Sequence, residues 1–346
     1  MVTIRQVADE AGVSIGTVSR VLNNKPGVGQ TTRARVSQVA QALGYAIPKR
    51  TATTTAKITH LGLLNPPMHG GLMTSPFYHD VFLGVEQICQ EQNINLSYNT
   101  LDMADIAQKR LRSYPSLLNE INLNGLVLVG ALQTEIVSAI ADITPQPLIL
   151  VDNYLPADRW DSVMIDNICG MEKAVQYLVD QGHRHIALIN GPDRPSIVER
   201  RQGYQNVMAR HGLTPLMVTP PDLMPETVDD YVRQILGQAP QVTAFACSND
   251  MQAIGVVKKL QDLGYSIPAD FSITGFDDIS LAQYTSPPLT TVRVDRIALG
   301  RIAAETLLGR IQDSDRPTTK TILNVCLVER GSVQAPRTEP LLVVTA

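Results

Sequence analysis

Apolar positions follow two different periods along this chain. Up to about residue 45 they recur every three or four positions, as in Ile4, Val7, Ala8 and Ala11, which predicts amphipathic helices. From residue 58 onward, short apolar runs alternate with longer amphipathic stretches. The runs, which predict strands, are Ile58–Leu64, Ile94–Tyr98, Gly125–Val129, Pro147–Val151, His185–Ile189, Ala244–Cys247 and Phe271–Thr274. The stretches, which predict helices, include Phe77–Glu91, Met171–Gln181, Ile197–His211 and Met251–Leu263.

The first 45 residues predict three helices. Thr3 is placed to cap the first helix and Ser14 the second, and Gly12 permits a tight turn between them. Thr31 or Thr32 is expected to begin the third helix. Its apolar stripe is Ala34, Val36, Val39, Ala40 and Leu43. Two short helices joined by a glycine turn, with a third helix beside them, form a helix-turn-helix unit whose second helix enters the major groove of DNA.

The remaining chain predicts a two-lobed α/β body. Strands that alternate with helices over this length favour parallel, doubly wound sheets, and a body of this size is too large for one core. Ligands of open α/β sheets bind at the carboxyl ends of the strands, so the cleft between two lobes is the expected binding site. Neither G-x-G-x-x-G nor G-x-x-x-x-G-K-[ST] follows any predicted strand, so we expect no nucleotide cofactor.

Charge is distributed unevenly. Residues 1–60 carry eight basic and two acidic side chains, whereas the remainder carries 21 basic and 31 acidic ones. A basic head on an acidic body suits nucleic-acid binding by the head alone, although a solvated basic surface has the same composition.

Membrane and secreted proteins are not expected. No run of about 18 apolar residues could span a bilayer. The first residues also lack the basic start and apolar stretch of a secretory signal. Cys89, Cys169, Cys247 and Cys326 lie far apart, and we expect four buried thiols in a reducing cytoplasm rather than disulfides or a zinc site.

Two motifs suggest chemistry that their context does not favour. The segment 12–16 matches G-x-S-x-G, the nucleophile elbow of hydrolases, but a short helical pattern precedes it instead of a strand. We interpret its Ser14 as a helix cap. His183 and His185 have no third metal ligand nearby in sequence, so we expect structural packing rather than a metal site.

Motifs along almost the whole chain carry a family resemblance. In the head they are Thr3 to Ala8, Ala11 to Ser14, Thr17 to Asn23 and Leu43-Gly44-Tyr45. In the body they are Ser75 to Tyr78, Asn124 to Leu128, Gly182 to Ala187, Asn190-Gly191-Pro192, Arg200 to Tyr204, Ser248-Asn249-Asp250, Gly275 to Asp278 and Pro287 to Val292. With these motifs the sequence resembles the LacI/GalR family of bacterial transcription repressors.

The resemblance implies an α/β fold with an N-terminal three-helix helix-turn-helix domain and a two-lobed, periplasmic-binding-protein-like core. The implied DNA-binding domain is 1–48, followed by a hinge at 49–57, an effector-binding and dimerisation core at 58–340 and a tail at 341–346. Each lobe is then discontinuous. Lobe one takes about 58–163 and 293–322, and lobe two about 164–292 and 323–340.

The resemblance places base readout at the start of the second helix, at Ile15, Gly16 and Arg20. Arg20 can bind guanine with two hydrogen bonds, whereas Ile15 can meet only an apolar base edge. The other implied DNA contacts, which position the head on phosphates, are Thr3, Ser14, Thr17, Ser19 and Asn23. The alternative for each is an ordinary helix cap or exposed helix face.

The hinge departs from the family pattern. Relatives carry a short helix with a leucine that wedges into the minor groove, whereas the matching position here falls near Thr55 or Ala56. Residues 51–55 also contain four threonines, which are poor helix formers. We therefore favour a polar linker, in which Lys49, Arg50 and Lys57 follow phosphates, over a DNA-kinking wedge.

The resemblance also implies an effector site in the cleft. Its residues are Phe77, Tyr78, Asp152, Arg200, Asn249 and Asp277. Carboxylate, amide and guanidinium groups bind sugar hydroxyls, and an aromatic ring covers an apolar sugar face. The alternatives are turn or helix-cap duty for Asn249 and Asp277, and a surface ion pair of Arg200 with Glu199 or Asp193. Leu223 stands where many relatives place a stacking aromatic.

These observations predict a homodimeric, sequence-specific repressor without enzymatic activity. We expect it to bind a pseudo-palindromic double-stranded operator, because a two-fold dimer presents two identical heads. A small effector, most simply a sugar, is expected to control operator affinity. Two rival interpretations are a transporter's solute-binding protein, which has no need of residues 1–48, and an α/β enzyme, for which no catalytic triad was found in context.

Overall fold

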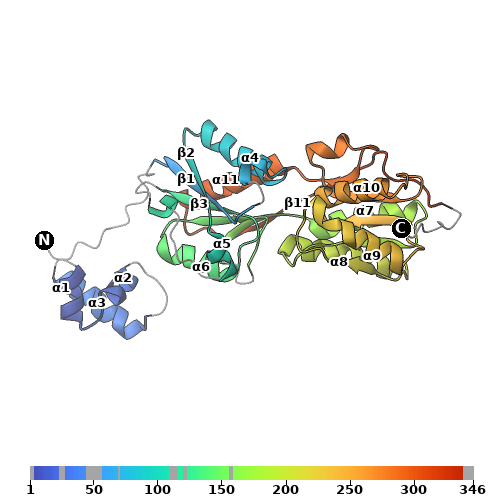
Figure 1. The fold of residues 1–346 in the computed structure, drawn as a ribbon. Helices are drawn as coiled ribbons and strands as arrows, with labels where there is room; N and C mark the ends of the chain where they lie inside the picture. Colours follow the sequence, from blue (N-terminus) through green and yellow to red (C-terminus); the bar gives the residue numbers. More distant parts are fainter. Residues whose placement is uncertain are drawn as a thin grey trace. The chain divides into compact units, whose positions relative to one another are not determined.

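The computed structural model of the protein describes residues 4–22, 28–43, 57–68, 71–108, 116–119, 123–155 and 159–337. The chain divides into two compact units, Met1–Lys57 and Ile58–Ala346 (Figure 1). We refer to them as the head and the core.

The head contains three helices: α1 (Ile4–Ala11), α2 (Ile15–Leu22) and α3 (Gln30–Ala42). Gly12 has a φ of 61°, the left-handed conformation that glycine adopts readily, and it ends α1 in a tight turn. The Ser14 hydroxyl accepts a hydrogen bond from the backbone N–H of Thr17 at 3.1 Å. The predicted cap of the second helix is therefore confirmed.

Small side chains from all three helices form the core of the head. They are Val7, Ala8, Ala11, Val18, Val21, Val36 and Ala40. Two predictions for the third helix were wrong. Its first turn already closes with the bond from Arg33 N–H to Gly29 O, so Thr31 and Thr32 lie inside it. Ala34 is exposed. Each residue turns an α-helix by about 100°, so Ala34 lies on nearly the opposite face from the buried Val36.

The first sheet of the core has the strand order β11-β5-β4-β3-β1-β2, and all its neighbouring strands are parallel. The bounds are β1 His60–Asn65, β2 Asn95–Thr100, β3 Gly125–Val129, β4 Leu148–Val151, β5 Asp161–Ile165 and β11 Lys320–Leu323. Helices α4 (Tyr78–Glu91) and α11 (Arg296–Gln312) pack together on one face, and α5 (Met103–Ala107) and α6 (Thr134–Ile143) lie on the other (Figure 1). The short helices η1 (Leu72–Thr74) and η2 (Ser116–Asn119) complete this part, which we call lobe one.

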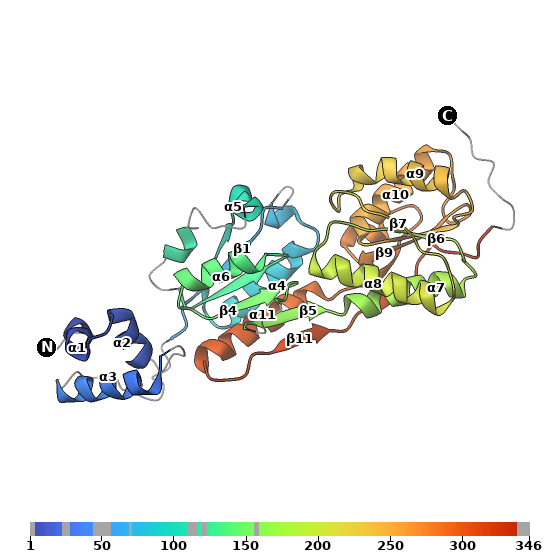
Figure 2. The ribbon, with the colours of Figure 1, turned by 90° about the horizontal axis from the view of Figure 1, so that it is seen from below.

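The second sheet has the order β12-β10-β9-β8-β6-β7, parallel except for the antiparallel pair of β10 and β12. The bounds are β6 Ile186–Ile189, β7 Leu216–Val218, β8 Ala244–Cys247, β9 Ser272–Asp277, β10 Thr290–Arg293 and β12 Cys326–Val328. Helices α7 (Asn167–Asp180) and α8 (Pro195–Arg210) lie on one side of this sheet, and α9 (Asp229–Gln238) and α10 (Asp250–Asp262) on the other (Figure 2). With η3 (Pro225–Val228) and η4 (Ser280–Gln283), they form lobe two.

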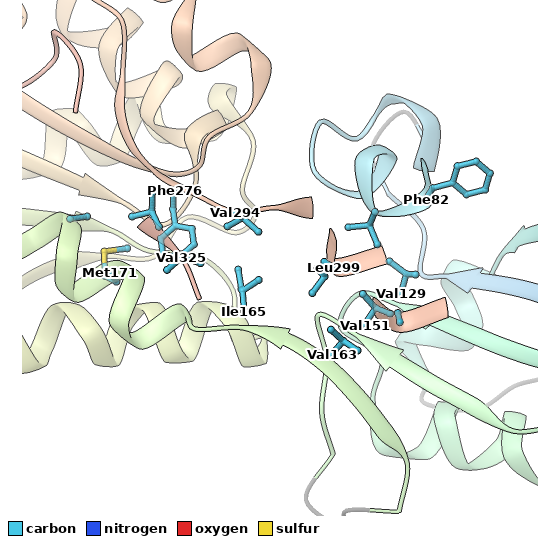
Figure 3. Packing of buried hydrophobic residues seen from close by; sticks show 14 of the residues in the cluster. Phe82, Val129, Val151, Val163, Ile165, Met171, Phe276, Val294, Leu299 and Val325 are labelled. Atoms are coloured by element: carbon cyan, nitrogen blue, oxygen red, sulfur yellow. The ribbon is translucent and has the colours of Figure 1, made fainter. Parts of the chain in front are cut away.

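The chain crosses between the two sheets after Ile165, after Arg293 and after Leu323. One cluster of buried apolar side chains runs through both lobes at these crossings. Ile165 and Val294 lie between a lobe-two group that contains Phe276 and a lobe-one group that contains Val151 (Figure 3). The limits predicted for the domains and lobes stay a prediction.

The predicted α/β fold class, with a helical head and two mostly parallel sheets, is confirmed. The prediction of four buried cysteines was wrong: Cys89 and Cys247 are buried, Cys169 is half-buried and Cys326 is exposed. Cys326 lies on β12, an edge strand that has only one neighbour. In the part of the chain that the structure describes, no helix is long and apolar enough to cross a bilayer.

Candidate functional site

Polar side chains gather where the parallel strands end. Asp152 directly follows β4, Asn190 follows β6, Ser248 follows β8 and Asp277 is the last residue of β9. All four are buried, which is unusual for such side chains unless they are paired or functional. Asp152 and Asp277 also have positive φ angles, 53° and 110°, a conformation that is costly for residues other than glycine and that clusters at functional sites.

Lobe one contributes an aromatic side chain and a carboxylate. Tyr78, the first residue of α4, donates a hydrogen bond from its hydroxyl to Oδ2 of Asp152 at 2.7 Å. The ring of Phe77 meets that of Tyr78 edge-on at 5.0 Å. Burial raises the pKa of Asp152 to about 6, although the Tyr78 hydrogen bond and the charge of Arg200 act against it. Burial and Asp152 raise the pKa of Tyr78 well above its ordinary value, which keeps this donor protonated.

Lobe two contributes Arg200, which α8 holds at 4% exposure. Its Nε donates to Oδ1 of Asn167 at 3.0 Å and its Nη1 to the carbonyl of Ser248 at 2.6 Å. Its Nη2 lies 3.1 Å from Oδ1 of Asp277, and the guanidinium stacks 3.7 Å above the ring of Phe276. Every edge of the guanidinium therefore has a partner, and its orientation is fixed before any ligand binds.

The surface ion pair offered as an alternative for Arg200 was wrong. Asp193 pairs with the neighbouring Arg201 at 2.8 Å, and Glu199 accepts a hydrogen bond from Asn167 at 3.0 Å. Arg200 instead points inward, because the face of α8 that carries it packs on α7 and the end of β8.

Asp277 is held from both lobes. Burial raises its pKa, and the charges of Arg200 and Arg296 partly offset this effect. Arg296, on α11 of lobe one, donates to the carbonyls of Asp277 and Asp278. The same guanidinium forms an ion pair with Asp80 of α4 at 2.9 Å. Arg296 thus fixes the strained backbone from which the Asp277 carboxylate projects, and it ties that backbone to lobe one.

Asn249 performs the cap role that the sequence left open. Its Oδ1 accepts a hydrogen bond from the N–H of Gln252 at 2.9 Å and begins α10. Its Nδ2 donates to the carbonyl of Leu223 at 3.4 Å. Leu223 has no ring, so this segment offers no stacking face.

Two buried amides of the site were not predicted from the sequence. Asn190 accepts from the Ser248 hydroxyl at 3.2 Å, and Gln252 donates to the carbonyl of Asn190 at 2.6 Å. Their other polar atoms, Asn190 Nδ2 and Gln252 Oε1, are buried with no hydrogen-bond partner among the described residues, as is Oδ1 of Asp152. The position of Asn190 directly after a strand was a usable signal, since Asp152 has the same position after β4. Gln252 offered none, because it lies inside a helix.

The site residues of lobe one and those of lobe two lie close enough to interact electrostatically. Arg200, Asp277 and Arg194 of lobe two all act on the pKa of Asp152 in lobe one. The site therefore combines oriented hydrogen-bond donors and acceptors with opposite charges that balance. Such a set suits a neutral, polyhydroxylated ligand better than an ion, whose charge has no counterpart here.

His183 has the structural role that the sequence predicted, whereas His185 is exposed and does not pack in the core as predicted. His183 is 1% exposed and hydrogen-bonds with Thr243 Oγ1 at 2.8 Å and the carbonyl of Gln334 at 2.9 Å. Burial lowers its pKa to about 4. Over the described ranges, no group of three or more potential ligand side chains is placed to hold a metal ion.

The candidate DNA contacts lie on and beside α2. Ser14 and Gly16 are exposed, and Thr17 is half-buried. The Ser14 and Thr17 hydroxyls lie 2.9 Å apart, so both are already engaged at the start of the helix. Thr3 and Asn23, the side chains of Ile15, Ser19 and Arg20, and the predicted linker positions Thr55 and Ala56 lie outside what the structure describes.

Comparisons with known proteins cover both units. Residues 3–47 match the description "Bacterial regulatory proteins, lacI family", and residues 175–333 match "Periplasmic binding protein-like domain". The chain is 32% identical over 342 residues to the ribose operon repressor of Haemophilus influenzae, which covers 96% of this chain and 99% of the relative. It is 31% identical over 339 residues to the transcriptional repressor PurR of Vibrio atlanticus, with 96% and 99% covered.

A solved structure resembles the whole chain as well. A complex of the transcriptional regulator CelR with cellobiose superposes with a TM-score of 0.72 at 27% identity, covering 96% of this chain and 100% of that one. All three relatives are named as repressors or transcriptional regulators. Since the match to curated relatives exceeds 30% identity over nearly the full length, the chain belongs to the LacI family of bacterial regulatory proteins.

Proposed function

We propose that this protein is a homodimeric transcription repressor whose affinity for a pseudo-palindromic operator is controlled by a neutral sugar bound between the lobes. The observation that carries the effector part is the set of buried polar groups at the strand ends. Arg200 and Asp277 are fixed there, while Asp152, Asn190 and Gln252 each have one buried polar atom without a hydrogen-bond partner among the described residues. Burying such atoms costs free energy unless a ligand pairs with them. We place its action in the cytoplasm, where its operator lies.

The effector is proposed to contact both lobes. The proposed contact residues are Phe77, Tyr78, Asp152, Arg200, Asn249 and Asp277, joined by Asn190 and Gln252. A ligand that bridges Asp152 and Asp277 favours one arrangement of the lobes over another, and only this differential affinity can shift operator binding. D-Ribose is the first candidate, since the Haemophilus influenzae relative is named for the ribose operon.

The head is proposed to read DNA with α2. The proposed DNA contacts are Thr3, Ser14, Ile15, Gly16, Thr17, Ser19, Arg20 and Asn23. We retain the division into residues 1–48 for DNA binding, 49–57 for the linker, and 58–340 for effector binding and dimerisation, with 341–346 as a tail. Two heads on a two-fold axis require two operator half-sites, which makes the operator a pseudo-palindrome.

The experiment has two stages. A thermal-shift screen of the full-length protein against D-ribose, cellobiose and purine bases identifies the ligand, because a ligand selective for the native state raises Tm. Operator sequences are then selected from randomised duplexes, and their affinity is measured with and without that ligand. Reciprocity requires the operator to change the ligand's affinity by the same factor. Equal ligand affinities with and without operator would refute the allosteric proposal.

A further inference from the structure

A cavity of about 300 Å³ lies in lobe one, apart from the site at the strand ends. Leu150, Ser162 and Lys320 stand beside one another in register on three parallel strands, β4, β5 and β11, so their side chains share one face of the sheet. They line the cavity together with Tyr154, Leu155 and Trp160. The volume is at the lower end of the range typical of small-molecule sites.

The lining separates into an apolar part and a cationic part. Two aromatic rings and two leucines supply apolar surface, whereas the Nζ of Lys320 lies 3.6 Å from the centre of the Tyr154 ring. Among the described residues, Lys320 forms no ion pair with an acidic side chain. The adjacent Asp161 is engaged by Arg310 at 2.8 Å and by the N–H of Thr319 at 2.8 Å.

A second cation contacts a lining residue, since the guanidinium of Arg159 lies 5.0 Å from the ring centre of Trp160. A cation that an aromatic ring holds in place favours an anionic ligand, and Lys320 has no carboxylate partner among the described residues. The aromatic walls favour a flat apolar group on the same molecule. Both requirements are met by a small aromatic carboxylate.

We propose that this cavity is a second small-molecule site, which binds an aromatic carboxylate with its ring against Trp160 and Leu150 and its carboxylate on Lys320. The Ser162 hydroxyl, on the cavity floor between Leu150 and Lys320, offers a further hydrogen bond. The site is distinct from the effector site in both location and ligand charge: the effector site balances its charges internally, whereas the cavity carries Lys320, which has no ion-pair partner among the described residues.

A chain of contacts joins the cavity to the effector site. Glu199 of lobe two lies close enough to the Tyr154 hydroxyl that, together with burial, its carboxylate raises the pKa of that hydroxyl. Glu199 accepts from Asn167 at 3.0 Å, and Asn167 accepts from Arg200 at 3.0 Å. A ligand that moves Tyr154 therefore acts on the arginine proposed to bind the effector. This consequence rests on the proposed function, whereas binding at the cavity does not.

Trp160 is the only tryptophan of the chain, so its fluorescence reports directly on the cavity. Full-length protein is titrated with phenylacetate and, in parallel, with the neutral phenylacetamide. We expect a saturable fluorescence change with phenylacetate and a Kd for phenylacetamide about tenfold higher, because the amide still accepts a hydrogen bond from Lys320 but carries no negative charge, and a hydrogen bond between two ionised groups is stronger. Lys320→Met should raise the phenylacetate Kd by a similar factor, and Lys320→Arg should largely restore it.

A control variant isolates the cavity. Lys258→Met removes an exposed lysine of α10 and should leave phenylacetate binding unchanged. The titration contains no effector, so it remains informative even where the effector screen finds no sugar. The proposal is overturned when phenylacetate gives no saturable change, when phenylacetamide binds equally well, or when Lys320→Met has the same Kd as the parent protein.

Discussion

The head and the core hold their functional side chains in opposite ways. In the head, the candidate contacts fall within about twenty consecutive residues, and those that the structure describes, Ser14, Gly16 and Thr17, are exposed or half-buried. In the core, Tyr78, Asp152, Arg200 and Asp277 come from positions as far apart as 199 residues in sequence, and the last three are at most 6% exposed.

This difference reflects the two ligands. DNA is a large, rigid polyanion, and an exposed helix surface reaches it without closing around it. A small neutral ligand gains affinity from buried, oriented groups that surround it. We therefore expect substitutions in the core to change effector binding and to leave operator binding without effector unchanged. Substitutions in the head should change operator binding and leave effector binding unchanged.

Arg200→Met should have the largest effect. It leaves Asp277 buried without its ion-pair partner, which costs about 3–5 kcal/mol of stability. Effector affinity should fall by about 30-fold or more, because a buried charged partner is lost. Calorimetric unfolding and effector titration measure these effects, and operator binding without effector should persist.

The neighbouring Arg201→Met is the matched control. Arg201 lies on the same helix and pairs with the exposed Asp193, a type of surface pair that contributes about 0–1 kcal/mol. It should bind effector like the parent protein. Equal losses in the two variants would show that the buried network around Arg200 has no special role.

Arg20→Ala should affect the head alone. A bidentate arginine–guanine contact contributes about 1–3 kcal/mol of discrimination in each half-site. Operator affinity should therefore fall much further than affinity for random DNA, and effector binding should not change. Competition binding assays on both duplexes measure the ratio. Arg35→Ala, on the exposed side of α3, should lower both affinities equally; the same pattern for Arg20→Ala would contradict base readout.

The same contrast explains what the sequence predicted. The three head helices depend on local patterns, namely the spacing of Val7, Ala8 and Ala11 and the cap at Ser14, and these local signals predicted them. The start of α3 was misplaced because a threonine is a good cap, whereas the structure begins the helix one residue before Thr31. In the core, β3 and β8 were predicted to the residue, because buried parallel strands are short continuous apolar runs.

The candidate site was less predictable, because it depends on contacts between distant segments. Nothing local shows that Arg200 turns inward to Asp277, since a charged residue within a helix usually faces water. Arg296 forms an ion pair with Asp80 and donates a hydrogen bond to the carbonyl of Asp277, so it connects two residues that lie more than 190 positions apart in sequence. Only the family resemblance pointed to Arg200 and Asp277, and it did not point to Gln252 or Arg296.

Effector binding should depend on pH through Asp152. Its pKa of about 6 means that the carboxylate, which accepts a ligand hydroxyl, becomes protonated as pH falls below 6. Effector affinity should therefore be constant above about pH 7 and fall about tenfold by about pH 5, whereas head-only DNA contacts should not show this dependence. Titration calorimetry over this range measures it.

The matching stability effect has the opposite direction. Because the native pKa lies above the unfolded value of about 3.9, Asp152 favours the folded state most at low pH, and this contribution is lost as pH rises from about 4 to 6. Asp152→Asn should remove both dependences. If effector affinity in that variant still depends on pH, another group controls the dependence. Asp277 is then the next candidate, because burial raises its pKa too.

The smallest effect concerns Ser14, where cap and DNA contact coincide. Loss of the hydroxyl in Ser14→Ala should destabilise the head by about 1 kcal/mol, because the Thr17 N–H loses its partner. Ser14→Asp keeps a cap but adds a negative charge beside the proposed phosphate.

Calorimetry of the full chain should show a lower unfolding free energy of the head only in Ser14→Ala. Operator affinity should fall more in Ser14→Asp than in Ser14→Ala. An aspartate variant that binds operator like the parent protein would confine Ser14 to capping and leave phosphate contact to other residues of α2. The unfolding of the core should be the same in both variants, because the head and the core are separate compact units.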